Sequence, residues 1–173
     1  MAAKREGQDP HGAAVTLKQP QSRAEWLEAR SLIEQYAASL QLDLEFQNFS
    51  HELEHLAEEY APPGGAFLIA RDAKRALGCA GVRSFAGSDG EIKRLYVIPE
   101  ARGRGIGQLL ARRAVAEGRK LGYKRLLLDT LPAMHEAQGL YASLGFRPTA
   151  AYRFNPVPGA AYFELSLREH RHD

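Results

Sequence analysis

The chain has 173 residues, 45% hydrophobic and 25% charged, with a net charge of +2, which is typical of one soluble globular domain. A charge so near zero does not indicate a nucleic-acid partner, and the single cysteine, Cys79, excludes an intrachain disulfide or a cysteine-based zinc cluster. No apolar run approaches the roughly 18 residues of a membrane span, and the first residues lack the apolar core of a secretory signal, so we expect a cytoplasmic protein without a membrane partner.

The polar ends of the chain set the expected limits of the domain. Residues 1–12 predict a flexible tail, 13–168 a single folded domain, and 169–173 a polar C-terminal tail. Residues 13–19 then favour a short strand. Ser22-Arg-Ala-Glu25 follows as a capping box, and the apolar residues after it recur at loosely helical spacing, which predicts the first helix.

A second helix is expected to precede a run of strands. It begins at Ser50 and ends before Pro62-Pro63-Gly64-Gly65, because proline and glycine break helices. Residues 66–72 and 75–85 predict two strands joined as a hairpin. The turn Gly87-Ser-Asp-Gly90 leads into the next strand.

Helices and strands alternate in the last part of the chain. Apolar spacing over residues 103–121 suits an amphipathic helix, and residues 124–129 form a continuously apolar run typical of a buried strand. A helix is expected from about Ala133 to Leu144, and residues 146–154 and 160–167 are two last strand candidates. This order predicts one α/β domain with a mixed sheet.

Three glycines alternate with other residues in the stretch Ala101-Arg-Gly-Arg-Gly-Ile-Gly-Gln-Leu-Leu110, between a strand and a helix. The first N–H groups of a helix lack partners and carry the positive end of the macrodipole, and glycine lets the backbone approach an anion there. The order therefore predicts a phosphate site. A dinucleotide-binding fingerprint fails, because Gln108 stands where its third glycine is required, and the P-loop pattern is absent.

The pattern that fits is R-x-x-G-x-G, formed by Arg102, Gly105 and Gly107. Within EIKRLYVIPEARGRGIG, it resembles the pyrophosphate-binding signature of the GNAT superfamily of acyl-CoA-dependent N-acyltransferases. Downstream, AQGLYASLGF resembles a later helix of that superfamily and its ending, a tyrosine followed four residues later by Gly-Phe. The chain is also similar, in FQNF, LDTLP and YRFNPVPG, to a bacterial subgroup whose acceptors are mostly unassigned. The resemblance implies an α/β GNAT fold with a mixed, mostly antiparallel sheet, a splayed parallel strand pair and about four flanking helices.

The resemblance also implies acetyl-CoA as cosubstrate and no metal. The backbone N–H groups from Arg102 to Gln108 are expected to bind the CoA pyrophosphate, with the side chains of Arg102 and Arg104 adding positive charge. The backbone of residues 95–97 is expected to pair with the pantetheine arm like an added strand, where strands 91–98 and 124–129 splay apart. The expected cofactor-binding residues are Leu95, Tyr96, Val97, Arg102, Gly103, Arg104, Gly105, Ile106, Gly107 and Gln108.

Acyl transfer to an amine needs a neutral amine, a donor for the developing oxyanion and a proton for the leaving thiolate. By resemblance, Tyr141 is the expected general acid, because a phenol with a pKa of about 10 is protonated at neutral pH; packing in the core is its alternative role. Glu91 is the expected general base, with a solvated carboxylate at a strand end as the alternative. The N–H of Val97 is the expected oxyanion donor. Met134 stands where many members have a CoA-contacting asparagine, so no CoA contact is assigned to it.

His51-Glu-Leu-Glu-His55 matches the H-E-x-x-H pattern of zinc hydrolases. The extended form of that pattern fails at Glu58 and Ala61. The stretch HELEHLAEEY carries four glutamates, which favours an exposed acidic helix over a buried zinc-bearing one. A zinc hydrolase is therefore the remote alternative.

Basic residues dominate the segment from Arg102 to Arg125, where eight stand against one acid. Nucleic-acid binding is one interpretation of such a cluster. The spacing instead favours the outer face of an amphipathic helix for Arg112, Arg113, Arg119 and Lys120, so no nucleic-acid partner is expected.

The acceptor is expected opposite CoA, between the first two helices and the late strands. Phe46, Phe49, Tyr152 and Arg153 are the candidate lining residues; Arg153 suits a carboxylate-bearing acceptor, with a structural salt bridge as the alternative. The expected function is direct transfer of an acetyl group from acetyl-CoA to a primary amine of a small molecule or amino acid in a ternary complex. A non-catalytic acyl-CoA-binding or regulatory domain is the alternative. Dimers are common in the superfamily, so a homodimer is also expected.

Overall fold

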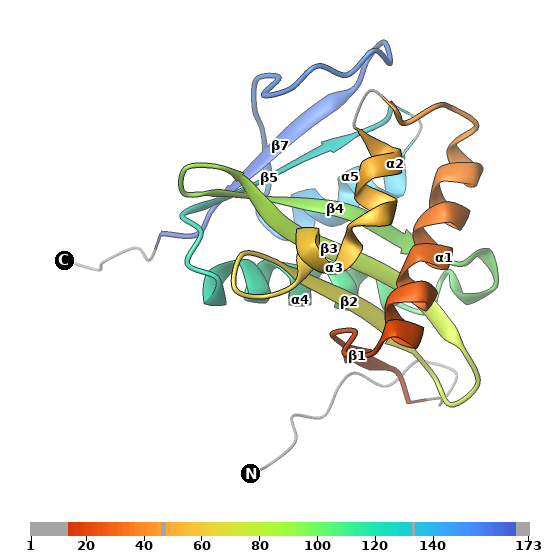
Figure 1. The fold of residues 1–173 in the computed structure, drawn as a ribbon. Helices are drawn as coiled ribbons and strands as arrows, with labels where there is room; N and C mark the ends of the chain where they lie inside the picture. Colours follow the sequence, from red (N-terminus) through yellow and green to blue (C-terminus); the bar gives the residue numbers. More distant parts are fainter. Residues whose placement is uncertain (1–13, 46–47, 133, 169–173) are drawn as a thin grey trace.

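The computed structural model describes residues 14–45, 48–132 and 134–168, so both expected tails lie outside the described residues. Within these ranges the strands form one seven-stranded sheet in the order β1-β2-β3-β4-β5-β7-β6 (Figure 1). All neighbours are antiparallel except β4 and β5, which run parallel, so the mixed sheet is confirmed. The strands are β1 (Thr16–Lys18), β2 (Ala66–Arg71), β3 (Ala76–Ala86), β4 (Asp89–Val97), β5 (Arg125–Thr130), β6 (Arg147–Pro148) and β7 (Ala161–Ser166).

Helices cover both faces of the sheet. In Figure 1, α1, α2 and α3 lie over one face, and α4 and α5 lie over the other. In the described part of the chain, no helix is both long and apolar enough to cross a membrane. The helices are α1 (Arg23–Leu40), α2 (Phe49–Glu54), α3 (Leu56–Tyr60), α4 (Ile106–Lys120) and α5 (His135–Ser143), with a 3₁₀-helix at Pro99–Ala101.

The capping box opens α1 as expected. Ser22 is its N-cap, and its hydroxyl accepts a hydrogen bond from the N–H of Glu25 at 3.1 Å. The carboxylate of Glu25 accepts in turn from the N–H of Gln21 at 2.8 Å. One face of α1 then buries Leu32 and Ile33 against the sheet, and full burial of such a side chain stabilises the fold by about 1.5–3 kcal/mol.

The expected single helix from Ser50 to the Pro-Pro-Gly-Gly breaker is wrong. His55 takes non-helical angles (φ −124°, ψ 30°) and divides the segment into α2 and α3. The expectation of an exposed acidic helix is wrong too, because Glu52 is 1% exposed and Tyr60 is fully buried. Glu52 can be buried because two arginines distant in sequence, Arg83 and Arg94, neutralise its carboxylate.

The expected strand over residues 146–154 shortens to β6. Pro148 has no N–H to donate to a ladder, and β6 pairs only with β7, at the edge of the sheet. Beyond it the side chains of Tyr152 and Arg153 turn to the carboxylate of Glu91 instead of continuing a strand. Ala133, the expected start of the last helix, lies outside the described residues, and α5 begins at His135.

The strands β4 and β5 separate after a short parallel contact. Their pairing spans Asp89 to Glu91 on β4, and Glu91 lies opposite Leu127. The expected splay between these two strands is therefore confirmed. On its other edge β4 carries a β-bulge, where the pairing with β3 shifts between Cys79 and Gly81 and Arg94 takes a φ of 61°. The splay and the bulge place the candidate site at the middle of the sheet.

Candidate active site

A groove of about 730 Å³ follows the end of β4, between the start of α4 and helices α1 and α5. We call it the donor groove. Eight of the ten expected cofactor-binding residues line it; Arg104 and Gln108 are not part of its wall. The eight are Leu95, Tyr96, Val97, Arg102, Gly103, Gly105, Ile106 and Gly107. The fold thus brings the strand end and the glycine-rich turn to one surface.

The glycines of the turn have two different roles. Gly103 and Gly105 take φ values of 80° and 76°, in the left-handed region that favours glycine. Gly105 is the N-cap of α4 and has no side chain to satisfy the first N–H groups of the helix, which leaves them for an anion. Gly107 lies within α4 and on the groove wall, where a Cβ would stand 3.8 Å from Val97 and 3.9 Å from Leu140. Its missing side chain widens the groove.

The free edge of β4 faces the donor groove. The N–H of Ile98 donates to the carbonyl of Leu77 on the β3 side at 2.9 Å. Because paired and unpaired positions alternate along an antiparallel ladder, the N–H and C=O of Val97 point away from β3, toward the side that β5 has left. The Nε of Arg102 donates to the carbonyl of Val97 at 3.1 Å, so this side chain lies at the strand end.

A second, narrow cavity of about 60 Å³ lies at the splay of β4 and β5; we call it the inner cavity. Tyr36, Leu95, Met134 and Ala137 line both the inner cavity and the donor groove, so the two adjoin. Burial raises the pKa of Tyr36 to about 12, which keeps its hydroxyl protonated at neutral pH. The inner cavity and the donor groove thus share part of their walls at the splay of β4 and β5.

Tyr141 belongs to the wall of the inner cavity. Its side chain comes from α5, is 5% exposed and meets the ring of Phe146 edge-on at a centroid distance of 5.5 Å. Burial, and then the nearby Tyr36 and Asp129, raise its pKa above the ordinary value of 10. Tyr141 thus packs in the core, which was the alternative to its expected catalytic role, and it also contributes to the wall of the inner cavity.

Glu91 is fully buried and is not among the residues that line the inner cavity. The expectation of a solvated carboxylate at a strand end is therefore wrong. The hydroxyl of Tyr152 donates to its Oε2 at 2.8 Å, and Nη2 of Arg153 donates to its Oε1 at 2.7 Å. Arg83 and Lys93 add positive charge at 3.7 and 3.9 Å. Glu91, Tyr152 and Arg153, three of the expected site residues, therefore lie together in a closed ionic cluster. Arg153 forms the structural salt bridge that was the alternative to a role in binding the acceptor.

The other two acceptor candidates are placed differently. Phe49 starts α2, and its ring lies 5.1 Å from the guanidinium carbon of Arg94, outside the wall of the inner cavity. Phe46 lies outside the described residues.

The polar residues on the inner cavity wall were missed by the sequence reasoning. Asp129 is the penultimate residue of β5, and its carboxylate accepts a hydrogen bond from the side-chain amide of Asn155 at 3.3 Å. Beside it, the buried hydroxyl of Thr130 has no hydrogen-bond partner among the described residues. Lys93 is 5% exposed, and burial lowers its pKa to about 8 despite the opposing pull of Glu91. Two signals pointed to Asp129 and Thr130, the LDTLP stretch that contains them and the expected splay, which leaves the end of β5 facing a cavity.

The H-E-x-x-H segment does not assemble as a metal site in the described ranges. His51 and His55 stack at a centroid distance of 4.2 Å, but no group of three or more candidate metal ligands forms there. Glu52, the motif's carboxylate, is 1% exposed and bonds to Arg94 and Arg83 instead.

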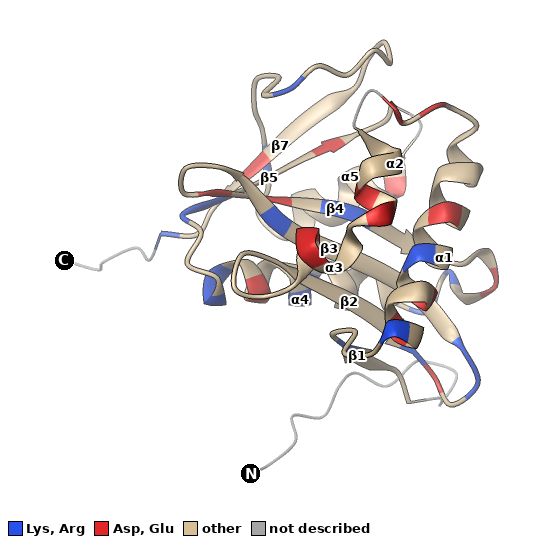
Figure 2. Cartoon of the chain, in the orientation of Figure 1, with Lys and Arg blue, Asp and Glu red and all other residues tan. Residues whose placement is uncertain are grey.

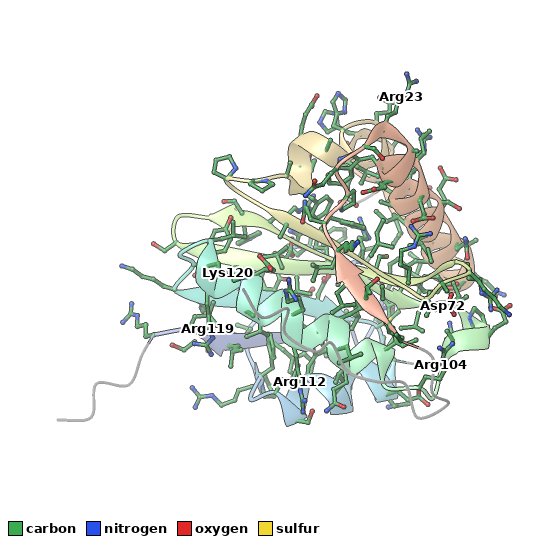
Figure 3. All side chains as sticks on the ribbon, turned by 90° about the horizontal axis from the view of Figure 1, so that it is seen from below. Arg23, Asp72, Arg104, Arg112, Arg119 and Lys120 are labelled. Carbon is green, nitrogen blue, oxygen red and sulfur yellow. The ribbon has the colours of Figure 1, made fainter. Side chains whose placement is uncertain are left out.

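The basic residues of α4 lie on its outer side, as the spacing predicts. Figure 3 shows Arg112, Arg119 and Lys120 projecting from the helix, and all three are exposed. Arg113 pairs along the helix with Glu117 at 3.1 Å.

Comparison with known proteins agrees with this geometry. The model of the Acetyltransferase (GNAT) family matches residues 26–146. An uncharacterized N-acetyltransferase of Schizosaccharomyces pombe is 41% identical over 140 residues, covering 80% of this chain and 86% of that protein. A GNAT acetyltransferase structure from Staphylococcus aureus has a TM-score of 0.74 at 19% identity, covering 90% of this chain and 100% of that one. The structure of a proposed acetyltransferase of Salmonella typhimurium with its cofactor acetyl-CoA has a TM-score of 0.64 at 22% identity, covering 91% and 96%. The chain belongs to the GNAT family of acetyltransferases.

Proposed function

We propose that the protein transfers an acetyl group from acetyl-CoA to a primary amine of a small molecule or amino acid, by direct attack in a ternary complex. One observation carries the proposal: the donor groove, with its glycine-rich helix start, adjoins an inner cavity on whose wall a buried, protonated tyrosine stands. The acetyl-CoA in the Salmonella relative supports the choice of donor. The proposal includes one domain over residues 13–168, a cytoplasmic location and a homodimer.

The donor is proposed to lie along the groove. Its pyrophosphate meets the N–H groups from Arg102 to Gln108, where the start of α4 attracts an anion. Its pantetheine arm pairs with the backbone of residues 95–97, along the edge that β5 leaves open, and leaves the N–H of Val97 to the thioester carbonyl. The side chain of Arg102, now on the carbonyl of Val97, then exchanges that acceptor for the cofactor.

The chemistry proceeds by nucleophilic attack on the thioester. The lone pair of the neutral amine forms the C–N bond while the N–H of Val97 stabilises the oxyanion. The C–S bond then breaks, and the sulfur takes the proton of Tyr141. The amine loses one proton, which Glu91 accepts through a relay, because its carboxylate is buried behind Tyr152 and Arg153. Asp129 lines the inner cavity directly and is the alternative acceptor for that proton.

The acceptor is proposed to reach the inner cavity from the side of α1, α2 and the segment after β6. On this side Tyr152 and Arg153 bind the carboxylate of Glu91. The ring of Phe49 packs on the guanidinium of Arg94. Phe46 is proposed as a further contact on the same side.

The donor site is tested by calorimetric titration with acetyl-CoA. We expect Arg102→Glu to weaken binding at least about tenfold, a loss of about 1.4 kcal/mol, because the reversed charge faces the pyrophosphate. Arg112→Glu is the matched control, since Arg112 lies on the outer side of α4. Equal affinities of the Arg102→Glu variant and the wild type would show that the pyrophosphate is placed wrongly.

The activity is tested by CoA thiol release from acetyl-CoA across a panel of primary amines. An enzyme releases thiol only in the presence of certain amines. A protein that binds acetyl-CoA but gives no amine-dependent release over a broad panel is instead a binding or regulatory domain.

A further inference from the structure

The backbone of β4 is held in an unusual conformation beside the site. Arg94 takes a φ of 61°, in the left-handed region, although it is neither glycine nor asparagine and lies inside a strand. L-residues avoid this region because Cβ crowds the neighbouring carbonyl. A residue stays there when its surroundings fix it.

Two elements fix Arg94. From α2, the carboxylate of Glu52 pairs with the guanidinium at two points, 2.8 Å to Nε and 3.2 Å to Nη2, and both side chains are 2% exposed. From β3, the thiol of Cys79 donates to the carbonyl of Arg94 at 3.2 Å. Figure 2 shows the arrangement at a larger scale, with acidic residues on α2 and α3 over basic residues on β3 and β4.

The ion pair keeps its charges in this environment. Burial disfavours the carboxylate of Glu52, but Arg94 and then Arg83 outweigh burial and lower its pKa. A buried, bidentate arginine–carboxylate pair restricts the position of the arginine side chain more than a solvent-exposed ion pair does.

The bulge decides which backbone groups reach the donor groove. Before it Lys93 lies opposite Gly81, and after it Tyr96 lies opposite Cys79, so the pairing moves by one residue. Because sides alternate along a strand, this shift turns the N–H of Val97 toward the open edge; without the extra residue it would face β3.

We propose that Glu52 is a positioning residue: through Arg94 it holds the bulge of β4 and so aims the N–H of Val97 at the thioester carbonyl of the donor. The proposal rests on the proposed function, since it concerns the same acetyl-CoA. It gives the Glu52 of the H-E-x-x-H segment a role in acyl transfer without a metal.

The test follows the carbonyl stretch of acetyl-CoA labelled with ¹³C at the thioester carbon, bound to the protein, by infrared difference spectroscopy. A hydrogen bond to the carbonyl lowers its frequency. We expect wild type to lower it relative to free acetyl-CoA, and Glu52→Gln to lose more than about half of that shift while its Kd changes less than about threefold. Glu59→Gln is the matched control, since it removes a carboxylate from Arg83 in the same cluster but leaves Arg94 paired.

A second pair of variants separates the geometry from folding. Glu52→Gln combined with Arg94→Gly removes both charges and places glycine where a φ of 61° is favourable. Glu52→Gln combined with Arg94→Ala removes the same charges but gives no left-handed preference. We expect the glycine double variant to recover the frequency shift and the alanine double variant not to recover it. This comparison tests whether the backbone conformation at position 94 sets the hydrogen bond to the carbonyl, even if Glu52→Gln alone does not fold.

The outcomes distinguish this inference from the proposed function. A wild type that does not bind acetyl-CoA overturns both. A wild type that binds with a lowered frequency, beside a Glu52→Gln variant with the same shift, overturns only the role of Glu52. Equal shifts in the glycine and alanine double variants do so as well.

Discussion

Lys93 is a buried amine on the wall of the inner cavity, 3.9 Å from Glu91. Burial lowers its pKa from the ordinary 10.5 to about 8. The unfolded chain keeps the proton up to the ordinary value, so between pH 8 and 10.5 the unfolded state binds more protons than the native state. Stability therefore rises with pH across this window.

This predicts a pH-dependent difference between wild type and Lys93→Met. From pH 8 to pH 10 the free energy of unfolding of the wild type should increase relative to that of the variant by on the order of 2 kcal/mol. Urea denaturation at each pH measures it. A constant difference over that range would mean that Lys93 titrates normally in the folded protein.

At the scale of elements, alanine substitutions at the two glycines at the start of α4 should change the stability of the free protein in opposite directions. Gly105 has a φ of 76° and no atom within 4 Å of an added Cβ, so Gly105→Ala is limited by strain alone. Gly107 is helical with ordinary neighbours at 3.8 and 3.9 Å, so Gly107→Ala fits. We expect the first change to destabilise the free protein by about 1 kcal/mol and the second to stabilise it by about 0.5–1 kcal/mol. Thermal unfolding without acetyl-CoA gives both values.

A larger side chain at Gly107 should weaken the binding of acetyl-CoA, although alanine at this position is expected to stabilise the free protein. A valine there occupies the wall of the donor groove, so Gly107→Val is expected to weaken acetyl-CoA at least about tenfold in a calorimetric titration, even where the free protein is not destabilised. Unchanged affinity would place the cofactor away from this wall.

The elements show what local sequence signals can predict. The Ser22 capping box and the glycine-rich turn rest on neighbours within a few residues, and both were predicted. The burial of Glu52 depends on Arg94, 42 residues away in sequence, so periodicity could not reveal it.

The candidate site likewise has a part that the sequence predicted and a part that it did not. Its donor side is made mostly of backbone and glycines in one contiguous stretch, which a motif can identify. The surroundings of Glu91 depend on Tyr152 and Arg153, at separations of 61 and 62 residues, so the sequence named these residues without showing that they pair. Asp129 lies in the LDTLP stretch, but that stretch assigned it no role, and it becomes a cavity residue because β4 and β5 diverge.

At the scale of the whole molecule, the open edge of β4 joins two sites. The donor groove lies toward α4 and α5, and the inner cavity lies where β4 leaves β5. Tyr141, carried by α5 to the wall of the inner cavity, is the proposed acid for the thiolate that leaves when the acetyl group is transferred.

The most direct test of the account is the rate of CoA thiol release with a reactive amine and saturating acetyl-CoA, in wild type and Tyr141→Phe. We expect the variant to lower kcat by about 10²–10⁴-fold and to bind acetyl-CoA as the wild type does, because only the phenolic proton is lost. Tyr123→Phe is the matched control, since that hydroxyl bonds to the carbonyl of Gly64, away from both cavities. A Tyr141→Phe variant that releases thiol at the wild-type rate would contradict the account.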